Sequence, residues 1–135
     1  MADYERSTSV EAPADRTFEW LADPRNMPAY TRMLVLADPI PDGVHIAAAT
    51  GDGMIERDVD VKADPIARRF EWHPRGSEYH GQMTVTEAPG GSRVTLRLHT
   101  TERVEPAQAD EAIRYTLNRI REGAAVASRA TPLPG

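Results

Sequence analysis

The chain has 135 residues, a formal net charge of -5 at pH 7 and no cysteine. A chain of this length builds one core, and without cysteine it has no disulfide, no thiolate nucleophile and no cysteine metal site. The acidic balance argues against a nucleic-acid partner, which requires a face rich in Lys and Arg. The longest apolar run, "MLVLA" at 33–37, falls far short of the roughly 20 residues that span a bilayer. We therefore expect a cytoplasmic protein that does not insert into membranes.

The first part of the chain predicts one strand and two short helices. Residues 3–11 alternate between apolar and polar side chains, as a half-buried strand does. In "APADRTFEWLADP", Pro13 suits the first turn of a helix and Pro24 ends that helix. A second short helix is predicted over 28–33.

The middle of the chain predicts six more strands. Turns are expected at "PDG", "GDG", "ADP", "PRGS" and "PGG", where Gly, Pro and Asp interrupt the alternation. The strands between these turns are expected at 34–39, 44–50, 54–63, 67–73, 78–88 and 92–104.

The last segment changes to a helical period. Its apolar residues recur every three or four positions and so line one face of a helix: Ala109, Ile113, Leu117, Ile120 and Ala124. A long amphipathic helix is therefore predicted over 106–128, followed by a disordered tail at 130–135. Because no repeat or linker divides the chain, we expect a single domain over 1–129.

This order of elements resembles the helix-grip fold of the START-like (SRPBCC) superfamily. The likeness is carried by "VEAPADRTFEWLADPRNMPAY" at 10–30, "RRFEWHPRG" at 68–76, "YHGQMTV" at 79–85 and the terminal helix. These segments make the chain similar to the polyketide cyclase/dehydrase and lipid-transport branch. The resemblance implies an α+β fold in which a curved seven-stranded antiparallel sheet wraps around the long C-terminal helix, with a cavity between them. Such folds host carriers, cyclases, hydrolases and chaperone-like proteins alike.

If the sheet encloses a cavity, the apolar face of each strand lines it. On this basis the predicted ligand-binding residues are Arg57, Val59, Phe70, Trp72, Tyr79, Gly81, Met83, Leu96, Leu98, Thr100, Ile113 and Leu117. A four-residue loop at "PRGS" would pair Trp72 with Tyr79 and Phe70 with Gly81. The glycine would then be covered by the Phe70 ring or would leave room for a ligand.

Two charged residues interrupt this apolar face. The predicted pairing sets Arg57, Trp72, Tyr79 and Glu102 in one row across the sheet. Because a buried charge is costly unless it is paired, two interpretations stay open. The charges either lie at the rim of the sheet, in solvent or paired with each other or with Arg6, or they bind the polar end of an apolar ligand at the cavity mouth.

The sequence offers few other chemical groups. No serine lies in a nucleophile motif. His80 and His99 fall on the outer face of neighbouring strands, where solvated side chains are expected and no metal site. No metal or other cofactor is expected. If the protein is an enzyme, Glu102 would act as acid or base, Tyr79 as hydrogen-bond donor and Arg57 as oxyanion stabiliser.

Three functions stay open from the sequence. The first is binding of a small, largely hydrophobic molecule, lipid-like or polyketide-like, in the cavity. The second, implied by the resemblance, is a cofactor-independent polyketide cyclase, aromatase or dehydratase. The third is a protein-binding or chaperone-like module. Assembly into a homodimer is also left open.

Overall fold

The computed structural model describes residues 2–100 and 106–130. Its elements run β1 (Ala2–Val10), α1 (Ala14–Ala22), the 3-10 helix η1 (Pro24–Asn26), α2 (Met27–Tyr30), β2 (Leu34–Ile40), β3 (Gly43–Thr50), β4 (Gly53–Asp64), β5 (Arg69–Pro74), β6 (His80–Ala88), β7 (Gly91–Thr100) and α3 (Pro106–Ala130). This order confirms the predicted succession of elements. The expected end of the last strand at 101–104, and residues 131–135 of the expected tail, lie outside the described residues.

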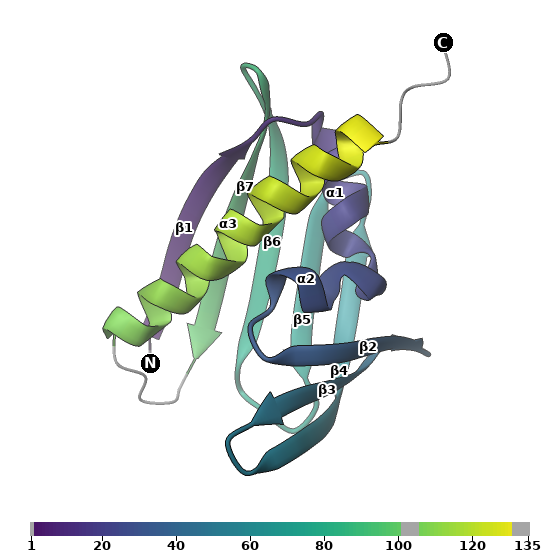
Figure 1. The fold of residues 1–135 in the computed structure, drawn as a ribbon, viewed down its shortest axis with the longest axis vertical. Helices are drawn as coiled ribbons and strands as arrows, with labels where there is room; N and C mark the ends of the chain where they lie inside the picture. The colour runs from purple at the N-terminus through teal and green to yellow at the C-terminus, as the bar shows by residue number, and fades with distance from the viewer. Residues whose placement is uncertain (1, 101–105, 131–135) are drawn as a thin grey trace.

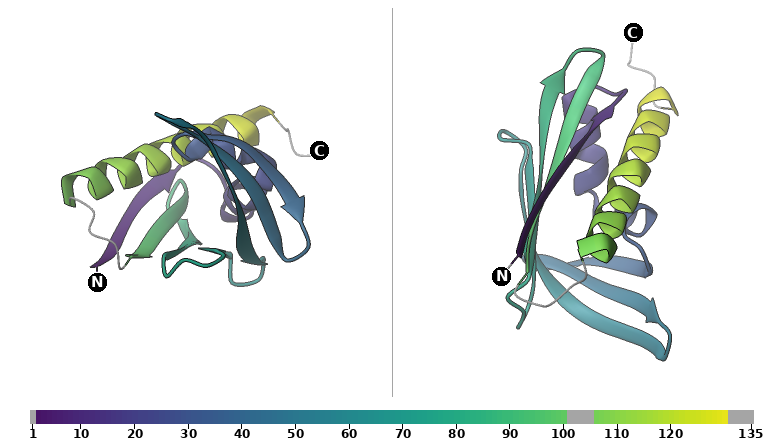
Figure 2. Two further views of the ribbon diagram at one scale, coloured as in Figure 1. Left: turned by 90° about the horizontal axis from the view of Figure 1, so that it is seen from below. Right: turned by 90° about the vertical axis from the view of Figure 1, so that its left-hand side faces the viewer.

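The seven strands form one antiparallel sheet in the order β1-β7-β6-β5-β4-β3-β2. In Figure 1, α3 lies diagonally across one face of this sheet, beside α1 and α2. The two views of Figure 2 show that the sheet is curved and that all three helices lie on its concave side. The α+β helix-grip architecture expected from the sequence is therefore confirmed.

The core lies between α3 and the concave face of the sheet. Ile113, Leu117 and Ile120 of α3 are buried there with Phe70 and Leu96 of the sheet, because each element turns its apolar side inward. Helix α1 approaches α3 closely, since a side chain on Gly123 would overlap the indole of Trp20. No helix among the described residues is long and apolar enough to cross a membrane.

The hairpin register differs from the predicted one by two residues. Phe70 pairs with Met83, and Trp72 pairs with Gly81. The loop after β5 is longer than four residues, since β5 ends at Pro74 and β6 begins only at His80. Within this loop the Tyr79 backbone N–H donates to the Ser77 hydroxyl oxygen at 3.0 Å. A shift of two positions keeps every side chain on its predicted face. The side chains of β5 and β6 that were predicted to point inward therefore do so, although their cross-strand partners differ.

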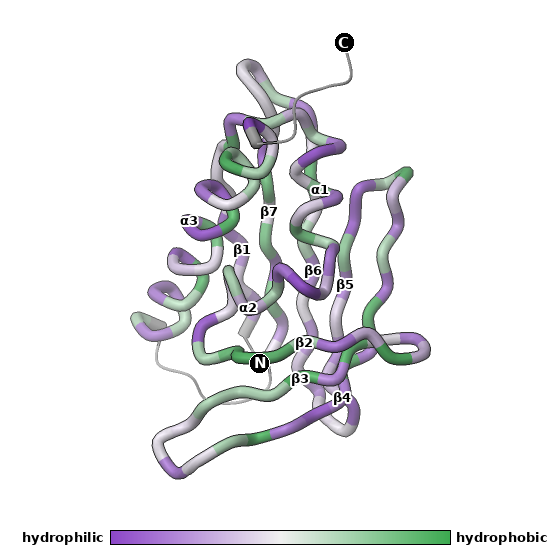
Figure 3. Tube along the Cα trace, turned by 45° about the vertical axis from the view of Figure 1, so that its right-hand side comes forward, coloured by the Kyte–Doolittle hydropathy of each residue, from purple (hydrophilic) through white to green (hydrophobic). Residues whose placement is uncertain are grey.

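One corner of the sheet extends beyond α3. Figure 1 shows β2, β3 and β4 running away from that helix, which packs against β1, β7 and the other two helices. Several apolar side chains are consequently exposed at this corner: Met33, Val35, Leu36, Met54 and Ile55. Figure 3 shows the start of β2 and the adjoining part of β3 as hydrophobic.

Candidate functional site

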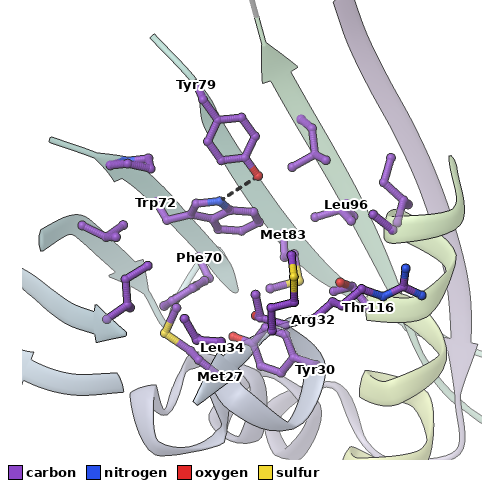
Figure 4. A pocket seen from close by; sticks show the side chains of 18 residues that line it. Met27, Tyr30, Arg32, Leu34, Phe70, Trp72, Tyr79, Met83, Leu96 and Thr116 are labelled. Carbon is purple, nitrogen blue, oxygen red and sulfur yellow. Dashed lines mark hydrogen bonds between the residues drawn. The ribbon is translucent and has the colours of Figure 1, made fainter. Parts of the chain in front are cut away.

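A cavity of about 350 Å³ lies between the concave face of the sheet, α2 and the first half of α3. Figure 4 shows the side chains around it. The predicted residues that line it are Val59, Phe70, Trp72, Tyr79, Met83, Leu96, Leu98 and Ile113. These residues meet there because the apolar face of each strand from β4 to β7 turns toward α3, as strand periodicity requires.

Four other predicted residues do not line the cavity. Leu117 is buried one helical turn further along α3, within the packed core. Thr100 is buried where β7 pairs with β1. Arg57 is exposed, and Gly81 lies beneath another side chain. Glu102 lies outside the described residues, so its predicted place in the row is not described.

The placement of Arg57 corrects the predicted row across the sheet. Arg57 faces Ile46 of β3, whereas Val61 stands opposite Trp72. Arg57 lies on the inward side of β4, but the sheet at this position extends past α3. The arginine is exposed because none of the helices in the described part of the chain covers this end of β4, and its charge needs no buried partner.

The space above Gly81 is filled by Trp72, not by Phe70. A Cβ atom on Gly81 would overlap the six-membered ring of the Trp72 indole and approach Leu98 to 2.9 Å. The ring of Phe70 lies beside that of Trp72, with centroids 5.9 Å apart. The glycine thus lets the indole lie flat on the sheet, where it forms a wall of the cavity.

Tyr79 brings a hydroxyl group to this wall. Its oxygen lies 3.4 Å from the Trp72 indole nitrogen, which donates the hydrogen bond drawn in Figure 4. Burial raises the pKa of the Tyr79 hydroxyl above its ordinary value, and the bond from Trp72 offsets only part of this effect. The phenol is therefore neutral at physiological pH and keeps its O–H as a donor toward the cavity.

One wall of the cavity, supplied by α2 and the residues after it, was not predicted from the sequence. Its members are Met27, Tyr30, Thr31, Arg32, Met33 and Leu34. The apolar residues in "MPAYTRML" were a signal, but a helix of four residues is too short to show a periodic face. The Tyr30 hydroxyl donates to the carbonyl of Leu21 at 2.7 Å, and burial raises its pKa. Tyr30 thus presents its ring, with its hydroxyl group already bonded.

Three exposed residues mark the mouth of the cavity: Arg32, Met33 and Ala112. Both terminal nitrogens of Arg32 lie 3.4 Å from Oε1 of Glu111 on α3. The guanidinium carbon also lies 4.9 Å from the centre of the Tyr115 ring, within range of a cation–π contact. These contacts place the Arg32 side chain against α3 beside the opening.

The histidines on the convex face lie apart from the cavity. His80 stands opposite His99, and their rings stack with centroids 4.8 Å apart. A second contact joins His80 to His73 edge to face at 6.4 Å. Within 2–100 and 106–130, no three His, Asp or Glu side chains are grouped so as to hold a metal ion.

The fold has several solved counterparts, and the three described next are each below 25% identical to this chain. The di-domain ARO/CYC protein BexL, from the BE-7585A biosynthetic pathway, matches with a TM-score of 0.74 and 23% identity over 98% of this chain and 48% of its own. StfQ, a di-domain ARO/CYC protein of the steffimycin pathway, matches at 0.69 and 18%, over 93% and 45%. The present chain thus spans about half of either protein. A START superfamily protein from Mycobacterium smegmatis matches at 0.69 and 9%, over 95% and 97%.

At the level of sequence, no curated protein matches the chain. A family model does match it, over residues 1–129, and its description is polyketide cyclase/dehydrase and lipid transport. This match spans the curved sheet, the helices that line the cavity and all of α3 but its last residue. The chain therefore belongs to the polyketide cyclase/dehydrase and lipid-transport family.

Proposed function

We propose that the protein binds a small, largely hydrophobic molecule in the cavity between the sheet and α3. The observation that supports this proposal is the lining of the cavity, which is mostly aliphatic and aromatic with a few polar groups. Small-molecule sites have this composition, because the apolar walls provide affinity and the polar groups fix orientation. A volume of about 350 Å³ is near the lower limit of such sites and favours a compact molecule.

The indole N–H of Trp72 and the hydroxyl of Tyr79 can each exchange their present hydrogen-bond partner for a ligand. The bond between Trp72 and Tyr79, at 3.4 Å, is longer than the usual 2.7–3.2 Å. A ligand oxygen can therefore compete for the indole N–H or for the phenolic O–H at small cost. We expect the ligand to carry at least one such oxygen on the part that lies against Trp72 and Tyr79.

Binding is tested with the fluorescent neutral probe N-phenylnaphthylamine, whose emission rises in an apolar site. Wild type is expected to bind it with a dissociation constant below about a millimolar, equivalent to roughly 4 kcal/mol. Ala112→Trp should obstruct the mouth and weaken binding, whereas Asn118→Trp, on an exposed part of α3 away from the cavity, should not. Failure of the wild type to bind, or equal effects of the two substitutions, would contradict the proposal.

A cyclase, aromatase or dehydratase of polyketides is the second candidate. It is favoured by the neutral Tyr79 hydroxyl in the cavity and by the ARO/CYC proteins among the structural counterparts. Tyr79 would donate a hydrogen bond to a ketone oxygen, and Glu102 would move the proton, as predicted from the sequence. Turnover of a poly-ketone surrogate that is lost in both Tyr79→Phe and Glu102→Gln, with probe binding retained, would support this candidate. Unchanged turnover in both variants would reject it.

Two further expectations from the sequence stay predictions. Cytoplasmic location can be checked by fractionation of cells that produce the protein. Homodimer formation can be checked by light scattering across a range of protein concentrations, where a mass that stays at 14.9 kDa would exclude it.

A further inference from the structure

We infer that the ligand carries an oxyanion, a carboxylate or a phosphate, which binds Arg32 at the mouth while the apolar body fills the cavity. This inference rests on the proposed function, because it requires a molecule inside the cavity. It concerns a residue that the sequence analysis did not select, and it replaces Arg57 as the cation of the site.

Arg32 is the only charged residue among the described residues that line the cavity. Its side chain is 47% exposed, so the guanidinium group lies at the border between solvent and the apolar interior. An ionised group buried deep among Phe70, Met83 and Leu96 would lose its hydration without a compensating bond. A charged ligand group is therefore tolerated at the mouth, where Arg32 is, and is rejected further inside.

The present partner of Arg32 is held weakly. Both nitrogens reach the same oxygen of Glu111 at 3.4 Å, whereas strong charge-assisted bonds measure about 2.7–2.9 Å. Glu111 is itself 68% exposed, and exposed ion pairs contribute little to stability. Asp110, the residue before Glu111 on α3, is bonded to Arg6 and Arg114. A ligand oxyanion thus has one loosely held competitor for the guanidinium group.

The contact with Tyr115 prepares Arg32 for this role. With the guanidinium carbon 4.9 Å from the ring centre, the ring restricts the positions that the arginine can adopt. Less conformational freedom is then lost when a ligand binds. The two terminal nitrogens of an arginine match the paired oxygens of a carboxylate or phosphate. With Glu111 this bidentate arrangement is not formed, because both nitrogens share one oxygen.

The test compares two probes with the same apolar body. Anilinonaphthalene sulfonate carries an oxyanion, and N-phenylnaphthylamine does not. Arg32→Met should weaken sulfonate binding by about tenfold, the low end expected for a charged hydrogen bond at a partly exposed site. Binding of the neutral probe should change by less than about twofold, because van der Waals contact with the side chain is kept.

Glu111→Gln provides an independent test that leaves Arg32 in place. Removal of the competitor should strengthen sulfonate binding by about two- to fivefold, the range that corresponds to an exposed ion pair. Arg114→Met is the control for Arg32→Met, since it also removes one positive charge but at a residue of α3 that does not line the cavity, and Asp110 keeps its bond to Arg6. It should change the binding of either probe by less than about twofold.

The outcomes separate the inference from the proposed function. If the wild type binds neither probe, the proposed function is wrong. If the wild type binds both probes, but Arg32→Met weakens the binding of both equally or changes neither, the proposed function is supported and the oxyanion inference is wrong. The same conclusion follows if Glu111→Gln weakens sulfonate binding. Displacement of the neutral probe by naphthoate, naphthyl phosphate and naphthalenemethanol then identifies the headgroup, and an advantage for the alcohol over both anions would also overturn the inference.

Discussion

Trp72 and Gly81 face each other across β5 and β6, and the indole of Trp72 occupies the space where a side chain at position 81 would lie. A tryptophan in the middle of a narrow cavity could fill it. The missing side chain instead lets the ring lie against the sheet, beside Phe70 and within reach of the Tyr79 hydroxyl. The shape of the cavity therefore depends on one glycine that does not line it.

The first prediction concerns Gly81→Ala. The new methyl group would overlap the Trp72 indole, so that the ring must move off the sheet and into the cavity. We expect the free energy of unfolding to fall by about 1–3 kcal/mol, as is usual for overpacked cores. We also expect weaker binding of N-phenylnaphthylamine. Urea unfolding and probe titration measure the two effects.

Gly51→Ala is the control for this substitution. Gly51 lies in the β3–β4 turn, where an added Cβ would meet no atom within 4 Å. The free energy of unfolding of Gly51→Ala should stay within about 0.5 kcal/mol of that of the wild type. Equal behaviour of the two variants would show that the contact between Trp72 and Gly81 is not tight.

The second prediction concerns the buried pair of Thr17 on α1 and Ser92 on β7. Their hydroxyl oxygens lie 2.9 Å apart, and neither residue is exposed to solvent. Thr17→Val should destabilise the fold by about 1–3 kcal/mol, because it leaves the buried Ser92 hydroxyl without this partner. Adding Ser92→Ala should then cost less than it does in the wild type. Urea unfolding of the four proteins of this cycle gives the coupling energy, and strict additivity would contradict the expectation.

The third prediction concerns the pH dependence of stability through His45. Its Nδ1 lies 2.7 Å from Asp58 and its Nε2 lies 3.1 Å from Glu56, both on β4. The hydrogen bond to Asp58, and next the one to Glu56, raise the pKa of His45 above its ordinary value of 6.5. A raised pKa means that the protonated form is favoured in the folded state. The stabilising contribution is complete below pH 6.5 and is lost as the pH rises through the folded pKa.

The measurement compares wild type with His45→Gln by urea unfolding at several pH values from about 6 to 9. The difference in the free energy of unfolding between the two proteins should shrink as the pH rises. The contributions of the titrating groups that the two proteins share cancel in this difference. A difference that is constant, or that grows with pH, would show that the ion pairs of His45 do not persist in solution.

The fourth prediction concerns ionisation of Tyr79. Burial raises the pKa of its hydroxyl above the ordinary value of 10.0, so this group should be less ionised than exposed tyrosines at the same pH. The absorbance of tyrosinate, measured as the difference between wild type and Tyr79→Phe, should show that less than half of Tyr79 is ionised at pH 10. A half-complete titration at that pH would mean that the hydroxyl is open to water.

The fold was predictable because local sequence patterns indicate its strands and helices. Period-2 alternation and Gly or Pro turns mark the strands, and a helical period marks α3, so the order of elements and the inward faces of β4, β5, β6 and β7 followed from the chain alone. This inward set already contained Phe70, Met83 and Leu96. The register was wrong by two residues because β6 begins only at His80, so that the loop after β5 is longer than the four residues assumed, and alternation does not report the length of a loop.

The sequence by itself determined which side of each strand turns to the cavity, since a side chain must point to one face or the other. Only the tertiary structure decided how far the cover of α3 extends. That extent leaves Arg57 in solvent and brings Arg32, from a loop without any period, to the mouth. The physical reason is that the backbone of a single strand decides to which side of the sheet a side chain points. Whether that side chain is buried depends on which distant segment packs above it.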